Sequence, residues 1–211
     1  MNKSLIIFGT GGHARVVLET ALLTNKYKKI LFLDDRKKDK FLGYTILGNF
    51  DYLLKNKKNY YGFDIFVGIG DGNARIRSLE ILLKNDFQVP TILHPASWVS
   101  NTAILEKGSI VLANATVQAG VSAGLGTIVN NNASIDHECN LGKGVHICPG
   151  ANVAGNVIIG DKSWIGIGSR IIQNLKIGSE VVIGAGSCVI RNVIDGQVVY
   201  GVPAKESSKS K

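Results

Sequence analysis

The feature that most constrains the fold is an aliphatic residue at every sixth position from residue 99 to residue 189. Fifteen of the sixteen residues in this frame are Val, Ile or Leu. An α-helix repeats every 3.6 residues and an amphipathic strand every two, so neither keeps a strict period of six. A parallel β-helix does, because each hexad forms one flat side and one corner. The sequence therefore predicts a parallel β-helix over residues 96–194.

This repeat resembles that of the hexapeptide-repeat acyltransferases. The resemblance implies a left-handed β-helix with three hexads in each coil. Sixteen hexads then make about five coils, stacked about 4.8 Å apart as neighbouring strands are. Residues 18 positions apart become neighbours on adjacent coils, so the surroundings of each polar residue can be predicted.

One hexad, IDHECN at residues 135–140, departs from the pattern of Gly, Asn, Lys and Ser at outward positions. His137 and Glu138 hold its third and fourth positions, which project outward at a corner. The neighbours of His137 one coil away are the small residues Ala119 and Gly155. A single outward histidine is usually inert. A histidine beside a carboxylate, with space on both sides, is instead suited to act as a general base between two substrates.

The stretch SIDHECNLGKGVHICPGANVAGNVIIG is similar to the catalytic segment of bacterial acetyltransferases that act on nucleotide-linked amino sugars, such as the enzyme of bacillosamine biosynthesis, and of sialic acid O-acetyltransferases. The resemblance implies that His137 is the general base, that Glu138 increases its basicity, and that the Gly155 N–H lies near the acyl carbonyl oxygen. It implies homotrimers with the CoA channel between neighbouring β-helices. The residues implied to contact acetyl-CoA are His146, Gly155, Ile167, Ala185 and, in the GVPAK segment, Lys205.

In this chemistry a sugar amine attacks the acetyl carbonyl while His137 removes its proton, so no covalent acyl-enzyme is needed. The sequence leaves open whether Asp136 or Glu138 orients His137. Cys139 is a rival nucleophile, but it holds an inward hexad position and is expected to be a small core residue. Gamma-class carbonic anhydrases share the β-helix and bind zinc, but the spacing of His137 and His146 does not match theirs, so no metal is expected.

Residues 1–95 alternate strand-like and helix-like segments, which predicts a small Rossmann-like parallel α/β domain. The expected strands are SLIIF, KILFLDD, DIFVGIG and QVPTIL, and the expected helices cover about 12–24, 50–56 and 73–84. The loop GTGGHA fits the pattern G-x-G-x-x-A of dinucleotide sites, and Asp34 follows Ala14 at the spacing typical of a ribose-binding acid. However, a full dinucleotide-binding fold has two mononucleotide-binding halves, and this domain is large enough for only one of them. The rest of the chain shows no hydride-acceptor site. NAD is therefore not favoured.

The resemblance implies that this domain holds the nucleotide sugar instead. The implied residues belong to the glycine loop, the acidic pair after the second strand and the turn after the third strand: Gly11, Gly12, His13, Asp34, Asp35, Ile69 and Gly70. The alternative to ligand binding is a purely structural role. The glycines would then form a tight strand-to-helix turn, and the two acids a turn at the end of the second strand. His13 lies outside the dinucleotide pattern and is therefore the most informative of these residues.

Charge and composition narrow the class of protein further. The formal charge of +8 is mostly N-terminal, since residues 1–95 hold 15 Lys/Arg against 9 Asp/Glu. The lysines form scattered runs without an arginine-rich groove, so no nucleic acid is expected. No apolar stretch approaches the ~20 residues of a membrane span, and the three cysteines form no C-x-x-C pair. A cytoplasmic protein is expected, with residues 195–211 forming a CoA-proximal segment and a disordered Ser/Lys tail.

The sequence thus predicts an acetyl-CoA-dependent N-acetyltransferase that acts on a nucleotide-linked amino sugar, for which we favour a UDP-4-amino-4,6-dideoxy sugar. Two alternatives within the class are a sialic acid O-acetyltransferase and a GDP-perosamine N-acetyltransferase. An alternative of another class is a non-catalytic scaffold that binds nucleotide sugars. The His137–Glu138 pair argues against the scaffold, whereas the base, the sugar and the choice of N- or O-acetylation stay open.

Overall fold

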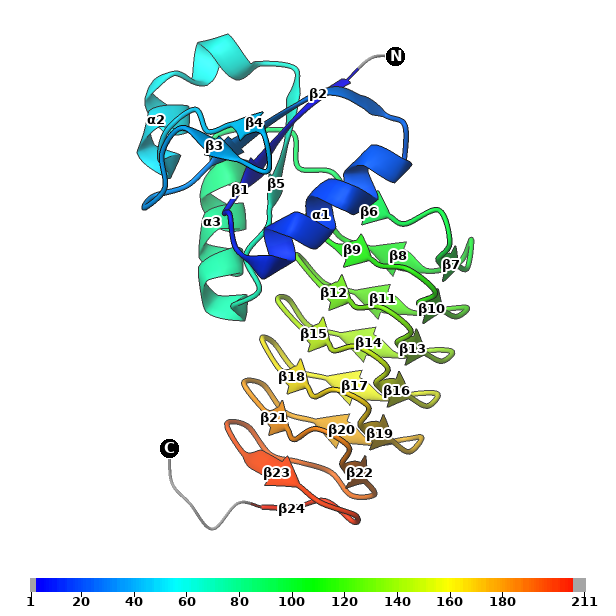
Figure 1. Ribbon diagram of the computed structural model, residues 1–211. Coiled ribbons are helices and arrows are strands. Elements are labelled where there is room, and N and C mark those ends of the chain that lie inside the picture. The colour runs from blue at the N-terminus through cyan, green and yellow to red at the C-terminus, as the bar shows by residue number, and fades with distance from the viewer. Residues whose placement is uncertain (1–2, 207–211) are drawn as a thin grey trace. The chain divides into compact units, whose positions relative to one another are not determined.

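The computed structural model of the protein describes residues 3–206, and the chain divides into two compact units, residues 1–95 and residues 96–211 (Figure 1). The first unit contains a parallel sheet with helices, and the second is a parallel β-helix. Both parts of the predicted fold class are therefore confirmed.

The sheet of the first unit has three parallel strands in the order β2-β1-β5: β1 (Lys3–Phe8), β2 (Tyr27–Leu33) and β5 (Phe63–Val67). Helix α1 (Gly12–Leu23) joins β1 to β2, and α3 (Gly72–Lys84) follows β5. The middle of β1 is fully buried, as expected for a parallel strand that is covered on both faces. The carboxyl ends of the three strands meet at one edge, where loops can form a binding site.

The rest of this unit holds short elements that the sequence did not all predict. Strands β3 (Lys40–Phe41) and β4 (Tyr44–Thr45) form an antiparallel hairpin, followed by α2 (Phe50–Lys55) and the 3₁₀ helix η1 (Lys57–Tyr60). The predicted strand QVPTIL was wrong in extent: Gln88 makes only a single bridge to Asp64, and β6 covers Ile92–Leu93. Pro90 explains the break, because proline has no N–H to donate to a sheet.

The β-helix has three faces of stacked two-residue strands. The first face contains β7 (Trp98–Val99), β10 (Thr116–Val117), β13 (Ser134–Ile135), β16 (Asn152–Val153), β19 (Arg170–Ile171) and β22 (Cys188–Val189). The second contains β8 (Ile104–Leu105), β11 (Ser122–Ala123), β14 (Asn140–Leu141), β17 (Ile158–Ile159) and β20 (Lys176–Ile177). The third contains β9 (Ile110–Val111), β12 (Ile128–Val129), β15 (His146–Ile147), β18 (Trp164–Ile165), β21 (Val182–Ile183), β23 (Val198–Tyr200) and β24 (Lys205–Glu206).

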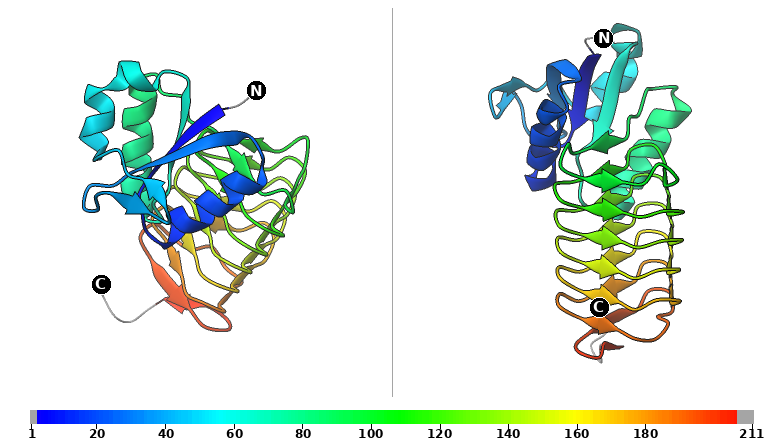
Figure 2. Two further views of the ribbon diagram at one scale, coloured as in Figure 1. Left: turned by 45° about the horizontal axis from the view of Figure 1, so that its top comes forward. Right: turned by 90° about the vertical axis from the view of Figure 1, so that its right-hand side faces the viewer.

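The predicted neighbour rule is confirmed, because residues 18 apart pair in parallel on adjacent coils, as Ile135 does with Val117 and Val153. The coils stack in one column, as the right-hand view of Figure 2 shows. The second residue of each strand from β7 to β22 belongs to the core or packs against it, which explains the aliphatic period. Many corners need a positive φ, which Gly and Asn adopt readily, and Glu138 adopts it too (φ 57). The predicted disorder of residues 207–211 lies outside the described residues.

The stacked core predicts that replacing an inward isoleucine by alanine destabilises the protein much more than replacing an outward one. Replacing Ile165, which is fully buried, by alanine should lower the free energy of unfolding by about 2–5 kcal/mol, because a cavity remains. Ile104→Ala is the matched control, since Ile104 also lies in a two-residue strand but is 65% exposed. Chemical denaturation of both variants measures the difference. Equal losses would contradict the assignment of the inward position.

Candidate functional sites

The first unit contains a cavity of about 440 Å³ at the carboxyl ends of its parallel strands. Its walls come from the loop after β1, the loop after β2 and the turn after β5. All seven residues that the resemblance implied for the nucleotide sugar line it: Gly11, Gly12, His13, Asp34, Asp35, Ile69 and Gly70. The structure therefore brings together residues that lie up to 59 positions apart in the sequence.

The glycine loop leaves open space in front of helix α1. A Cβ atom built on Gly11 or Gly12 would meet no atom within 4 Å, and Gly11, the N-cap of α1, supplies no side-chain cap. The first N–H groups of the helix are thus open to an anionic group in the cavity. Ala14 has a packing role, because a Cβ on Gly68 would lie 2.9 Å from the Cβ of Ala14. The third position of the motif therefore allows close contact between α1 and the end of β5.

The acidic pair makes structural hydrogen bonds at the cavity wall. Asp34 accepts from the Thr10 hydroxyl at 2.6 Å and from the backbone N–H groups of Arg36 and Lys37 at 2.9 and 2.8 Å. Partial burial alone would raise the pKa of Asp34, but these hydrogen bonds outweigh it and hold the pKa below its ordinary value. Asp35 accepts from the N–H of Phe50 at 3.0 Å. Both acids thus fix loops as well as line the cavity.

His13 is half-buried in the first turn of α1. Burial of the ring, with a smaller contribution from the positive charge of Arg75, lowers its pKa to about 4. The side chain is therefore a neutral imidazole at neutral pH. It can donate or accept a hydrogen bond to a ligand, but it supplies no positive charge.

Sequence reasoning missed two groups at this cavity. Arg75 of α3 is 1% exposed and donates to the carbonyls of Ile69 and Gly70, and its helical spacing from the buried Leu79 and Leu82 could have revealed it. Phe41 of the unpredicted hairpin is the other.

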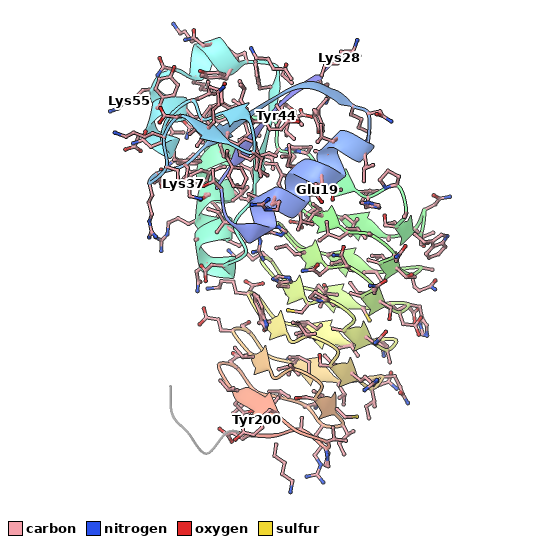
Figure 3. The ribbon with its side chains drawn as sticks, viewed as in Figure 1. Glu19, Lys28, Lys37, Tyr44, Lys55 and Tyr200 are labelled. Atoms are coloured by element: carbon pink, nitrogen blue, oxygen red, sulfur yellow. The ribbon has the colours of Figure 1, made fainter. Side chains whose placement is uncertain are left out.

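The Phe41 ring makes cation–π contacts with two basic side chains, Arg15 and Lys37. The guanidinium of Arg15 is 5.8 Å and the ammonium of Lys37 5.4 Å from the Phe41 ring centroid, within the range of cation–π contacts. Lys37, labelled in Figure 3, also donates to the Thr10 carbonyl in the glycine loop at 3.4 Å. Lys37, in the loop after β2, thus places a positive charge next to the glycine loop.

In the β-helix, His137 and Glu138 form the corner that follows β13 and are both exposed. The Nδ1 atom of His137 lies 3.4 Å from the Glu138 carboxylate. The Nε2 edge of the ring lies over Gly155, since a Cβ built there would be 2.5 Å from Nε2. Asp136 instead accepts from the backbone N–H of His137 at 2.8 Å. Of the two carboxylates, Glu138 is therefore the one placed to orient the ring.

Gly155 is buried beneath the His137 ring and has no room for a side chain. Its carbonyl accepts from the N–H of Asn174, but within residues 3–206 no hydrogen bond from its own N–H is found. A backbone donor next to a possible base is the arrangement that stabilises an oxyanion.

The other residues implied for acetyl-CoA lie elsewhere on the β-helix. His146 is 7% exposed on β15, with its ring 4.4 Å from that of Trp164 and its Nε2 3.0 Å from the Asn130 amide. Ile167 and Ala185 are exposed at the corner that follows the third face, and Lys205 is exposed in β24. Of the residues implied to contact acetyl-CoA, a single chain therefore brings only Gly155 next to His137.

Two alternatives can be judged from the same geometry. Cys139 is 1% exposed and its Sγ donates to the Ala154 carbonyl at 3.1 Å, and burial raises the pKa of the thiol. It is a core residue and not a ready nucleophile. Among residues 3–206, no group of three His, Cys, Asp or Glu side chains is arranged to hold a metal ion. In the same part of the chain, no helix is long and apolar enough to cross a membrane.

Comparison with known proteins finds relatives for both units. Residues 4–82 match the family model described as the PglD N-terminal domain, and residues 156–191 match that of the bacterial transferase hexapeptide with six repeats. The acetyltransferase domain of PglB from Neisseria gonorrhoeae FA1090 is 40% identical, with a TM-score of 0.93 over 98% of this chain and 100% of that chain. A further structure of that domain, equally similar, is a complex with acetyl coenzyme A.

Two more solved structures extend the comparison. PerB from Caulobacter crescentus, in complex with CoA and GDP-perosamine, is 30% identical, with a TM-score of 0.91 over 97% of each chain. WeeI from Acinetobacter baumannii AYE is 22% identical, with a TM-score of 0.88 over 98% of this chain and 100% of that chain, and shares the fold.

The lowered pKa of His13 predicts a pH dependence of stability. The unfolded chain protonates His13 near pH 6.5 and the folded chain near pH 4, so between these values the unfolded state binds more protons. The contribution to the free energy of unfolding is thus complete above pH 6.5 and is lost as the pH falls toward 4. Each unit by which the pKa of His13 differs between the folded and unfolded states corresponds to about 1.4 kcal/mol in the free energy of unfolding. The free energy of unfolding of His13→Gln should therefore depend on pH less steeply in this window than that of the wild type. Parallel wild-type and His13→Gln curves would show that His13 protonates normally.

Proposed function

Because this chain belongs to the hexapeptide-repeat sugar acetyltransferases that carry a PglD N-terminal domain, we propose that it acetylates the amino group of a UDP-linked 4-amino-4,6-dideoxy sugar, with His137 as the general base. Membership rests on the match to the PglB acetyltransferase domain over the whole of that chain. The protein is thus an enzyme that uses acetyl-CoA to N-acetylate a nucleotide-linked amino sugar. The observation that carries the proposed mechanism is the position of His137, with Nδ1 toward Glu138 and Nε2 over Gly155.

The proton path follows from the two ring nitrogens. When the Glu138 carboxylate accepts from Nδ1–H, the lone pair of Nε2 is free to take a proton. The sugar amine attacks the thioester carbonyl carbon and forms the N–C bond, while Nε2 takes a proton from that nitrogen. The oxyanion that develops accepts from the Gly155 N–H. The C–S bond then breaks, and the imidazolium returns its proton to the departing CoA thiolate.

The cavity of the first unit suits the nucleoside diphosphate of the substrate. The N-terminus of α1 opens into it without a side-chain cap, and Lys37 lies beside its glycine loop. These groups offer backbone donors and positive charge for phosphate oxygens. His13, as a neutral imidazole, supplies a hydrogen bond in the same cavity. We assign all seven residues implied by the resemblance to this binding step.

We also propose a homotrimer, with acetyl-CoA between neighbouring β-helices. The support is the separation of the implied residues: His137 lies at the corner before the second face, and Ile167 and Ala185 at the corner before the first face. These two corners flank the first face of one chain. A second copy that brings its own Ile167 corner to the His137 corner would complete the site. The unpaired state of Cys139, Cys148 and Cys188 fits our placement of the enzyme in the cytoplasm, where acetyl-CoA is made.

Two observations bear on the nucleotide. We favour the UDP-linked sugar of bacillosamine biosynthesis because the segment around His137 resembles the catalytic segment of the enzyme of that pathway. A GDP-linked 4-amino sugar is the second candidate, because PerB, which is 30% identical over 97% of this chain, was solved with GDP-perosamine.

The proposed base predicts the kinetic effect of three substitutions. With UDP- and GDP-linked 4-amino sugars as acceptors, His137→Asn should lower kcat by about 10²–10⁴-fold, because the proton acceptor is lost. The Kd of acetyl-CoA should change by less than about twofold. Gly155→Ala should lower kcat as well, since the added Cβ would displace the ring.

The matched control is His94→Asn, a histidine outside both sites, which should keep wild-type kcat. Thiol release followed at saturating acetyl-CoA gives the rates. A His137→Asn enzyme with near wild-type kcat would exclude His137 as the general base.

A further inference from the structure

Arg75 is a buried cation that contacts the turn after β5, which lines the nucleotide cavity. It lies in the first turns of α3, where the side chain is 1% exposed. Burial lowers its pKa to about 10, an effect that Asp71 partly opposes, so the guanidinium stays charged at neutral pH. Burying a charge costs free energy, and it is retained only where the charge makes compensating hydrogen bonds. The partners of Arg75 therefore indicate what the residue does.

These partners belong to the binding site. One nitrogen, Nη1, donates to the carbonyl of Ile69 at 3.0 Å and to that of Gly70 at 2.6 Å. Both residues lie in the turn after β5 that lines the cavity. A Cβ built on Gly70 would meet no atom within 4 Å, so there is space beside this turn, and the two hydrogen bonds of Arg75 tie the turn to α3.

Arg75 also acts on the opposite wall. Its positive charge contributes to the low pKa of His13 in the first turn of α1. The other titratable groups that line or flank the cavity are Asp34 and Asp35 after β2, Arg36 in the same loop, and Asp71 at the start of α3. His13 is the only imidazole among the residues that line the cavity. Imidazole is the side chain whose charge ordinarily changes between pH 5 and 8.

We propose that Arg75 is a positioning residue for nucleotide-sugar binding, which fixes the Ile69–Gly70 turn against the ligand and places a buried positive charge behind the diphosphate. The inference rests on the proposed assignment of this cavity to the nucleotide sugar. The charge acts across low-dielectric protein, where it favours an anionic ligand more than an exposed charge would. Because the same charge contributes to the low pKa of His13, its removal should raise that pKa and make the loss of affinity depend on pH.

The test uses Arg75→Gln, with Arg77→Gln as the matched control, because Arg77 lies on the same helix but is exposed. UDP and GDP serve as probes in calorimetric titrations of the full chain at pH 5 and pH 8. At pH 8, Arg75→Gln should weaken the Kd of the diphosphate that the wild type binds by about tenfold, the effect of losing a charged hydrogen-bonding group. Arg77→Gln should stay within about twofold, and so should the KM for acetyl-CoA in both variants.

The pH comparison separates positioning from a general loss of stability. The ratio of variant to wild-type Kd cancels the ionisation of the phosphate itself. In Arg75→Gln the pKa of His13 should rise, although burial still lowers it. More of the His13 side chains are then protonated at pH 5 than in the wild type, so that ratio should be smaller at pH 5 than at pH 8. Adding His13→Gln should remove this difference. A variant that is merely loosened would show no such change.

Arg75→Lys provides a second variant if the glutamine variant does not fold. Lysine keeps the charge but lacks the planar guanidinium that holds its donors in a fixed geometry, so we expect a smaller loss of affinity and no new pH dependence. Wild-type affinity in both folded variants would overturn the role of Arg75 and leave the proposed function intact. A wild-type enzyme that binds neither UDP nor GDP would overturn the proposed binding site and, with it, the role of Arg75.

Discussion

The parallel stacking of coils, in which residues 18 positions apart share one place in the cross-section, is the constraint on which the catalytic geometry depends. It places Gly155 directly beneath His137, and the absence of a side chain at Gly155 lets the ring lie against the backbone. The same stacking puts Gly120 on the other side, where a Cβ would lie 3.4 Å from the Glu138 side chain. The repeat that builds the core thus also clears space for the histidine and its carboxylate.

In the first unit the cavity is formed by loops at the carboxyl ends of parallel strands, and not by the stacking of coils. Glycines open the loop in front of α1, while Asp34 and Thr10 tie the loops after β1 and β2 to each other. The charges around the cavity have separate tasks: Asp34 is engaged in loop hydrogen bonds, Lys37 reaches the glycine loop, and Arg75 lies behind the turn after β5. The dinucleotide-like motif is therefore consistent with a site for a single nucleoside diphosphate.

Much of this account could be predicted from the sequence because its signals are local or periodic. The period of six fixes the register of the β-helix, and the register predicted that Gly155 neighbours His137 before the structure showed it. The hairpin around Phe41 was missed because its two-residue strands have no periodic signal. The strand QVPTIL was overextended because the apolar pattern outweighed the effect of Pro90. The helical spacing of Arg75 from Leu79 and Leu82 indicates that it is buried, but its contacts with the turn after β5 are tertiary and cannot be read from the sequence.

The reaction has two substrates, a nucleotide-linked amino sugar and acetyl-CoA, and the family relatives confirm this class of enzyme. We assign the nucleotide sugar to the cavity of the first unit and acetyl-CoA to the β-helix. The most direct measurement is mass spectrometry of the products after the protein is mixed with acetyl-CoA and a pool of UDP-, GDP- and dTDP-linked amino sugars. The account predicts that a UDP-linked 4-amino sugar gains one acetyl group on nitrogen and that free CoA appears in equal amount. Acetylation of a hydroxyl group, or no acetylated product from any amino sugar, would contradict it.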